Sequence, residues 1–301
     1  MNQFFVNFLK GIGIGSANVI PGVSGGTIAL LTGIFERLIN CLKSFNITAI
    51  QLLFKGKFKE LAKHIDLWFL ISVGLGVVVS IFTIAKLFEI WLAGYYSRIN
   101  LMCFFLGLVI ASIYYVGRTV KKWNMQTVLA FIIGAAIAIT IFILNYRKEI
   151  SLGAELQTAE MNRNFLYIML CGAVGICSMI LPGLSGSYIL LLMGVYDSII
   201  VSVSNLDWSI LIPFVIGAIA GLLAFSHVLS WVFKKFPDIT IALLTGFILG
   251  SIPVIYPWRN VFTHELMLPE ANIKLAIAIV LALIGAAVII LTEKMADKKR
   301  L

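Results

Sequence analysis

Residues 18–37 read N-V-I-P-G-V-S-G-G-T-I-A-L-L-T-G-I-F-E-R, and residues 179–198 read M-I-L-P-G-L-S-G-S-Y-I-L-L-L-M-G-V-Y-D-S. Each stretch contains one Pro-Gly-x-Ser-Gly element, at residues 21–25 (the first motif) and at residues 182–186 (the second motif). Proline removes a helical hydrogen bond and glycine loosens the backbone, so neither stretch can form one continuous helix. We therefore predict that both form broken helices.

The two stretches are copies of an internal repeat. When Pro21 is paired with Pro182, the offset is 161, and ten of the 29 positions in residues 11–39 are identical to their counterparts. A fainter echo at an offset of 139 pairs Gly107, Ser112 and Ile113 with Gly246, Ser251 and Ile252. An insertion in the first half would account for the difference between the offsets, and residues 41–63 fit it.

The composition is that of an integral membrane protein. Hydrophobic residues make up 60% of the 301 positions and charged residues 12%, whereas soluble globular chains have about 25% charged residues. This balance argues against a soluble enzyme and against nucleic-acid binding as the reason for the net charge of +9. Besides the broken regions Phe4–Ile39 and Phe165–Val203, six stretches are long enough to span a hydrocarbon core of about 30 Å. They are Leu67–Leu87, Leu101–Gly117, Thr127–Leu144, Ile210–Phe233, Ile239–Ile255 and Ile273–Leu291.

The basic residues predict the topology, because they accumulate on the cytoplasmic side of a membrane. If each broken region returns to its own side and the six other stretches cross, 16 of the 23 basic residues lie on one side, with both termini. If each broken region crossed once, Lys121 and Lys122 would lie opposite Lys234 and Lys235. We therefore expect both termini to be cytoplasmic in a multi-pass protein of the bacterial plasma membrane.

An odd number of crossings in each half inverts the second half relative to the first. The predicted fold is an all-α integral membrane protein with two inverted-topology repeats, each a re-entrant broken-helix hairpin plus about three transmembrane helices. We assign residues 1–145 and 162–292 to the two repeats of a single membrane domain spanning 1–301. Inverted repeats with broken helices near the midplane are typical of secondary transporters.

The insertion at residues 41–63 has an amphipathic pattern. It places apolar side chains at helical spacing, with lysines between them, which predicts a helix lying on an anionic leaflet. The apolar positions are Ile47, Ile50, Phe54, Phe58 and Leu61, and the lysines are Lys55, Lys57, Lys59 and Lys63.

The helix that resumes after each motif begins at a candidate anion site. A helix start presents unpaired amide N–H groups, glycines let a ligand approach the backbone, and hydroxyls can donate to it. These features favour phosphate, and two such ends entering from opposite faces would form one site near the bilayer centre. The alternative is a pair of structural hairpin turns whose serines cap their own helices. The candidate phosphate-binding residues are Gly22, Ser24, Gly25, Gly26, Thr27, Arg37, Gly183, Ser185, Gly186 and Ser187.

A few ionisable residues lie close to the predicted membrane core, where charge is costly. Arg37 could hold a phosphate through two parallel hydrogen bonds. Glu36 and Asp197 occupy equivalent repeat positions and could carry a coupling proton, unless all three side chains are solvated at the hairpin mouth. His227, inside a predicted spanning helix, is either a proton relay or a satisfied core histidine. We expect no catalytic residue, metal or cofactor.

The segments Asn18–Thr27, with the T-G-I-F-E-R that follows a few residues later, and Met179–Ser187 resemble the bacterial and archaeal DUF368 membrane family. Members of that family are regarded as polyprenyl-phosphate transporters, and the resemblance covers essentially the whole chain. It implies re-entrant helices and the return of undecaprenyl phosphate, the lipid carrier of cell-wall sugars, from the outer to the inner leaflet. Some members have Asp at the position of Asn18, so the resemblance supports no role for a charge there.

Two alternatives from other classes remain at this stage. An undecaprenyl-pyrophosphate phosphatase would share inverted repeats and Pro-Gly-x-Ser elements, but it needs an activated nucleophile and an arginine clamp. The motif cores contain no His, Arg or acid. A small-anion channel would keep the helix-end site and dispense with the lipid. The expected partners are polyprenyl phosphate and membrane lipids, and the sequence is also compatible with a homo-oligomer.

Overall fold

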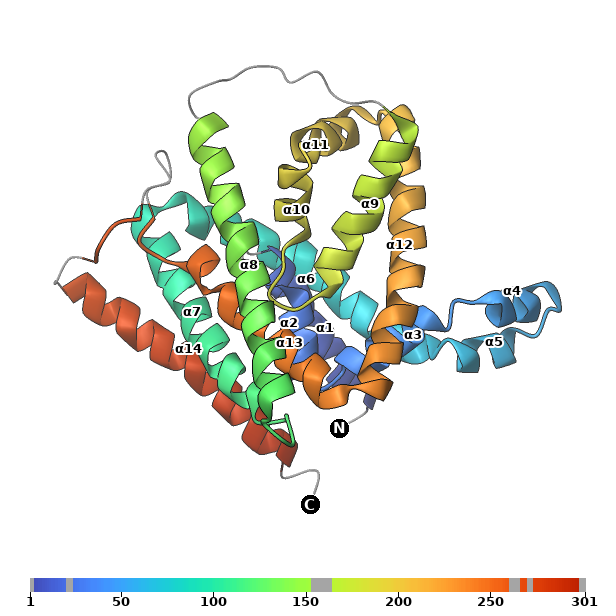
Figure 1. The fold of residues 1–301 in the computed structure, drawn as a ribbon, viewed down its shortest axis with the longest axis horizontal. Helices are drawn as coiled ribbons and strands as arrows, with labels where there is room; N and C mark the ends of the chain where they lie inside the picture. The colour runs from blue at the N-terminus through green and yellow to red at the C-terminus, as the bar shows by residue number, and fades with distance from the viewer. Residues whose placement is uncertain (1–2, 20–23, 153–163, 260–265, 270–272, 298–301) are drawn as a thin grey trace.

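The computed structural model describes residues 3–19, 24–152, 164–259, 266–269 and 273–297. Within these residues the chain is helical apart from its loops and one isolated bridge between Arg259 and Leu266 (Figure 1). The helices of the first half are α1 (Gln3–Val19), α2 (Gly25–Leu31), α3 (Phe35–Lys43), α4 (Ile47–Phe54), α5 (Phe58–His64), α6 (Leu67–Ala93), α7 (Tyr95–Gly117) and α8 (Met125–Leu152). Those of the second half are α9 (Phe165–Ile180), α10 (Gly186–Leu192), α11 (Tyr196–Asn205), α12 (Trp208–Lys235), α13 (Pro237–Gly250), the 3₁₀ helix η1 (Ile252–Ile255) and α14 (Ile273–Asp297).

The spanning helices agree with the sequence prediction. Five segments of the described chain are long and apolar enough to cross a membrane, and they lie in α7, α8, α12, α13 with η1, and α14. The sixth predicted span lies in the 27-residue α6. Its segment Leu67–Thr83 forms with α5 a pair bent by 65°. The expectation of an all-helical, multi-pass membrane protein is therefore confirmed.

Both predicted helix breaks are present. α1 ends at Val19 and α2 begins at Gly25, while α9 ends at Ile180 and α10 begins at Gly186. A second break, which we did not predict, follows each short helix, and α2 and α3 meet at a bend of 113°. Gly33 and Gly194, equivalent positions of the repeat, end α2 and α10 with φ of 69° and 73°. Glycine adopts this left-handed conformation without steric cost, which explains the stop.

The prediction of one amphipathic helix over the insertion was wrong in its extent. The structure has two short helices there, α4 and α5, separated at Gly56 with a φ of 66°. We call residues 47–64, which comprise α4 and α5, the arm. The arm projects sideways from the helical body (Figure 1).

The long helices pack in pairs through small residues. α1 lies along α6, α9 along α12, α8 along α13, and α7 along α14. A methyl group on Gly76 of α6 would lie 2.1 Å from the Phe8 carbonyl oxygen of α1, and one on Gly217 of α12 would lie 1.8 Å from the Met169 oxygen of α9. Within a bilayer the hydrophobic effect does not drive helices together, because lipid tails are as apolar as the side chains. Close backbone packing of this kind therefore supplies much of the attraction between them.

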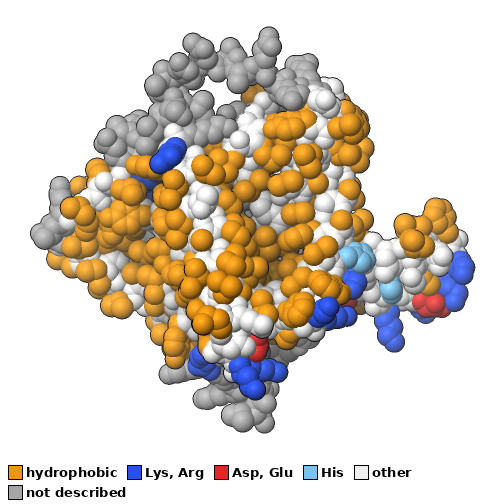
Figure 2. Space-filling model, in the orientation of Figure 1, with side chains coloured by type: hydrophobic (Ala, Val, Ile, Leu, Met, Phe, Trp, Pro, Cys, Tyr) orange, Lys and Arg blue, Asp and Glu red, His pale blue; other side chains and the backbone are white. Residues whose placement is uncertain are grey.

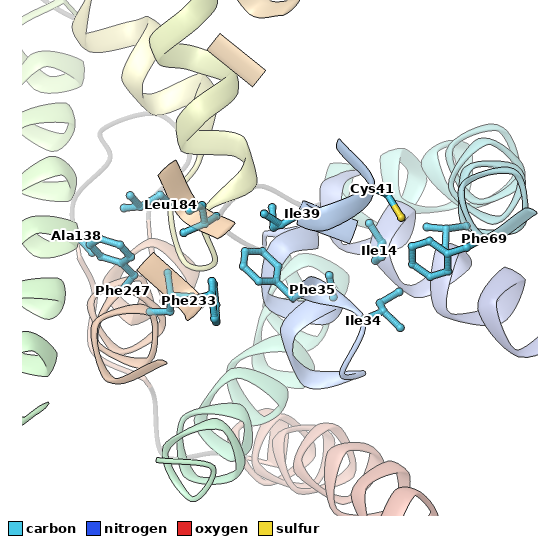
Figure 3. Packing of buried hydrophobic residues seen from close by; sticks show 14 residues of the cluster. Ile14, Ile34, Phe35, Ile39, Cys41, Phe69, Ala138, Leu184, Phe233 and Phe247 are labelled. Atoms are coloured by element: carbon cyan, nitrogen blue, oxygen red, sulfur yellow. The ribbon is translucent and has the colours of Figure 1, made fainter. Parts of the chain in front are cut away.

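A buried cluster joins the two halves of the chain. Phe35 and Ile39 of α3 belong to the same cluster as Leu184, between α9 and α10, and Phe247 of α13 (Figure 3). The rings of Phe35 and Phe233 lie 5.8 Å apart. Tight aromatic packing of this kind fixes α3 against α12 and thereby holds the first hairpin beside the second half.

Candidate functional site

The start of α2 meets the turn between α9 and α10, residues 181–185. The Gly183 backbone N–H donates to the Thr27 hydroxyl at 3.2 Å, and the Ser24 hydroxyl donates to the Leu181 carbonyl at 3.3 Å. A methyl group on Gly26 would lie 2.6 Å from the Ile180 carbonyl oxygen. The structure therefore brings residues that follow the first motif into direct contact with the second motif.

The helix starts after the two motifs differ in how they are capped. At α2, Asn18 Oδ1 accepts from the Gly25 N–H at 2.9 Å, and the Ser24 hydroxyl accepts from the Gly26 N–H at 3.2 Å. At α10, no side chain caps the helix start, and the Ser185 and Ser187 hydroxyls lie 2.8 Å apart. The self-capping alternative thus describes α2, whereas at α10 the two serine hydroxyls bond to each other and no side chain caps the helix start.

Gly183 fixes the second motif against α13. Its φ is 77°, and a methyl group there would lie 2.4 Å from the backbone carbonyl of Phe247. Both the left-handed conformation and the close approach require glycine at this position. The turn is therefore held in place by backbone packing.

A small cavity of about 20 Å³ lies beside the two motifs. Its lining includes polar groups from the start of α2, the second motif, α10 and the end of α13. The polar side chains are those of Ser24, Ser185, Tyr188 and Ser251, and the apolar wall includes Ala138, Ile141 and Phe142 of α8. A space of about 10–15 Å³ holds one water, so the cavity as it stands is too small for a phosphate group.

Arg37 and Glu36 lie at a different opening from this cavity. That opening, of about 440 Å³, is lined by both residues together with His64 and Asp66. Arg37 Nε donates to Asp66 Oδ2 at 2.7 Å, and its guanidinium lies 4.2 Å from the centre of the Phe69 ring. The structure therefore does not bring Arg37 to the predicted phosphate residues, because an ion pair and a ring contact hold it at α6.

Four further candidates from the sequence are Gly22, Asp197, Gly186 and His227. Gly22 and the side chain of Asp197 lie outside the described residues. Gly186 packs against α9, since a methyl group there would lie 2.2 Å from Met179 Cγ. His227 is not a core histidine: it is exposed on α12, and its Nδ1 lies 2.8 Å from the Leu223 carbonyl oxygen of the same helix.

Comparison with known proteins shows which family the chain resembles. The family described as undecaprenyl phosphate translocase-like matches residues 14–270. The chain belongs to this family. A polyprenyl-phosphate transporter from Vibrio cholerae is 32% identical over 98% of both chains, and one from Staphylococcus aureus is 28% identical over 85% of this chain and 88% of its own. No solved structure gives a significant match.

Two cavity residues of this translocase-like chain were missed by the sequence reasoning. Tyr188 is the repeat counterpart of Thr27, and both side chains lie at the meeting of the motifs. Ser251 is the counterpart of Ser112 in the fainter echo, and its hydroxyl donates to the Ile248 carbonyl at 2.8 Å. The echo was visible in the sequence, but its spacing alone gave no reason to place Ser251 beside the motifs.

Proposed function

We propose that this protein is a transporter that moves undecaprenyl phosphate, or a related polyprenyl phosphate, between the leaflets of the plasma membrane. The family match over residues 14–270 and the near-full-length similarity to two polyprenyl-phosphate transporters carry this conclusion. The apolar exterior of its spanning helices is suited to a substrate whose long tail stays in lipid.

The phosphate headgroup is proposed to bind where the two motifs meet. Ser185 and Ser187 supply hydroxyl donors there, and the uncapped start of α10 supplies amide donors. A phosphate is recognised by such groups without a basic side chain. The cavity is too small for it, so binding requires that the start of α2 and the second motif move apart.

Two inverted halves are proposed to provide this movement. The helix pairs support an inverted repeat, because α1 with α6 corresponds to α9 with α12, and α7 with α14 corresponds to α13 with α8. Exchanging the halves thus reproduces these four helix pairings. Rocking of one half against the other would expose the site first to one leaflet and then to the other.

The distribution of charge supports a cytoplasmic position for both termini. Most of the Lys and Arg side chains visible in Figure 2 lie at its lower end and on the arm, and the start of α1 and the end of α14 lie at that end in Figure 1. The positive-inside rule assigns this end to the cytoplasm. From the family resemblance, we propose that transport runs from the outer to the inner leaflet.

Proton coupling through Glu36 or Asp197 stays a prediction. Glu36 is exposed at the opening beside Arg37, where a carboxyl group can exchange protons with water. Transport by Glu36→Gln and Asp197→Asn should lose its dependence on a pH gradient, with Glu60→Gln on the arm as a matched control. Unchanged rates and unchanged pH dependence in both variants would remove the proton role.

A phosphatase fits the cavity poorly. None of the described residues that line it has an imidazole, guanidinium or carboxyl side chain, and phosphoryl transfer needs an activated nucleophile and a charge clamp. Purified protein should release no phosphate from polyprenyl pyrophosphate, and sustained release would favour the enzyme. A small-anion channel would instead conduct anions without the lipid.

Reconstitution tests the proposed function directly. Purified protein is placed in vesicles that carry polyprenyl phosphate, and the lipid in the outer leaflet is measured over time with and without an imposed pH gradient. We expect protein-dependent movement of the phosphate lipid between leaflets. Rates equal to those of protein-free vesicles would contradict the proposal.

A further inference from the structure

The arm carries an apolar face that no other part of the described chain covers. Ile47, Ile50 and Phe54 recur at the spacing of one helical face on α4, and their exposed fractions are 74%, 54% and 85%. Phe58, which opens α5, is 65% exposed. These exposed side chains belong to an element that stands away from the body (Figure 1).

The arm also carries a concentration of positive charge. Lys55, Lys57, Lys59 and Lys63 are all exposed, and of these Lys57 is paired with Glu60 at 2.9 Å. On α5, Lys59 and Lys63 are four residues apart and so share a face, about 100° or more around the helix from Phe58. Apolar and basic side chains are therefore segregated, as in helices that lie in a lipid interface.

The arm is oriented so that it could lie along a membrane surface. In Figure 2 most hydrophobic side chains of the arm lie on its upper side, the side from which the apolar surface of the body extends upward. Its lysines project from the lower and outer edges. An open groove of about 590 Å³ continues from the arm to α6, and its lining residues are Phe58, Lys59, Ala62, Lys63, Asp66, Leu67 and Trp68. The Asp66 carboxylate is paired with Arg37 at 2.7 Å, which leaves the two lysines as the groove's unbalanced charge. Trp68 is 70% exposed, and tryptophan is enriched where a membrane helix enters the interface.

We infer that the arm is an interfacial anchor that inserts Ile47, Ile50, Phe54 and Phe58 into an anionic lipid leaflet. The lysines lie among the lipid phosphates, and the groove between α5 and α6 receives an anionic headgroup. Two observations select a lipid surface over a protein partner. Phe58 of the apolar face lines the same groove as the exposed Trp68 of α6, and the adjacent lysines are complementary to anionic lipids.

Site-specific fluorescence tests this inference on the full chain in vesicles. The four native cysteines, three of which are buried, are first replaced so that a single environment-sensitive probe can be attached through Phe54→Cys. Lys63→Cys is the matched control, because both positions are exposed on the arm. Vesicles contain either phosphatidylglycerol or only phosphatidylcholine, with and without brominated lipid tails as quenchers. Size-exclusion profiles and reconstitution efficiency confirm that each variant is folded.

In phosphatidylglycerol vesicles the probe at Phe54→Cys should show a blue-shifted emission and lose intensity to brominated tails, whereas the probe at Lys63→Cys, at the level of the headgroups, should show a smaller shift and no quenching by the tails. Replacing Lys55, Lys57, Lys59 and Lys63 by Gln should reduce the quenching at Phe54→Cys. Emission at Phe54→Cys as water-like as at Lys63→Cys would overturn the inference. A blue shift without quenching by lipid would overturn it as well, by showing that protein covers this face.

Discussion

The Thr27 hydroxyl accepts a hydrogen bond of 3.2 Å from the backbone N–H of Gly183, a residue 156 positions away in the chain. Thr27 is only 2% exposed, so this bond is shielded from water. It connects the short helix after the first motif with the second motif itself. Two segments that are copies of each other in the sequence thereby lie in direct contact.

Removing this link should weaken transport. Thr27→Val keeps the shape of the side chain but leaves the Gly183 N–H without its partner, at a cost of about 1–3 kcal/mol for an unsatisfied buried group. We expect folded protein with reduced transport in the vesicle assay. The control is Thr32→Val, whose hydroxyl donates to the Ile28 and Ala29 carbonyls of the adjoining α2. Equal transport by the two variants would show that the link is dispensable.

The second motif should not tolerate a side chain at Gly183. Gly183→Ala places a methyl group 2.4 Å from the Phe247 carbonyl, at a φ of 77°. The left-handed conformation alone costs about 1–2 kcal/mol for alanine, and the close approach adds to it. We expect a lower thermal unfolding temperature in detergent.

Gly74→Ala is the matched control for this change, since a methyl group there meets no atom within 4 Å. It should leave the unfolding temperature unchanged or raise it slightly, because alanine favours the helix by roughly 0.5–1 kcal/mol. If Gly183→Ala were as stable as Gly74→Ala, the packing of the second motif on α13 would not be as described.

The serine hydroxyl of the second motif should contribute to substrate affinity. Ser185→Ala removes a donor beside the uncapped start of α10, and a hydrogen bond to a charged group contributes about 1.5–3 kcal/mol. We expect binding of polyprenyl phosphate to weaken about tenfold or more. Ser178→Ala should have little effect, because its hydroxyl bonds to helix carbonyls of α9. Binding curves that coincide for the two variants would contradict the proposed role.

Arg37 and Asp66 should behave as one unit that positions α3 against α6. Their side chains are 43% and 38% exposed, so the ion pair contributes no more than about 1 kcal/mol to stability. We expect Arg37→Ala and Asp66→Ala to lower transport modestly and by similar factors. A large loss with Arg37→Ala alone would instead show that Arg37 contacts the phosphate, as its charge first suggested.

The sequence predicted the features that follow from local chemistry and apolar length. The helix breaks at Pro-Gly-x-Ser-Gly and the spanning helices were recognisable because proline and long apolar runs act locally. The stops at Gly33 and Gly194 were not predicted, because a lone glycine in an apolar run does not reveal a positive φ. The salt bridge of Arg37 with Asp66 depends on where α6 begins in space, and the position of Ser251 depends on how α13 packs on α8.

The most direct test of the central claim is the reactivity of a single cysteine at Ser185→Cys in an otherwise cysteine-free chain. Its alkylation by a maleimide is timed with polyprenyl phosphate, with polyprenol, which lacks the phosphate, and without added lipid, while Lys122→Cys, exposed in the loop between α7 and α8, serves as control. We predict that only polyprenyl phosphate slows the reaction at Ser185→Cys and that the control is unaffected. Equal rates in all three conditions, or no reaction in any of them, would contradict a phosphate site between the two motifs.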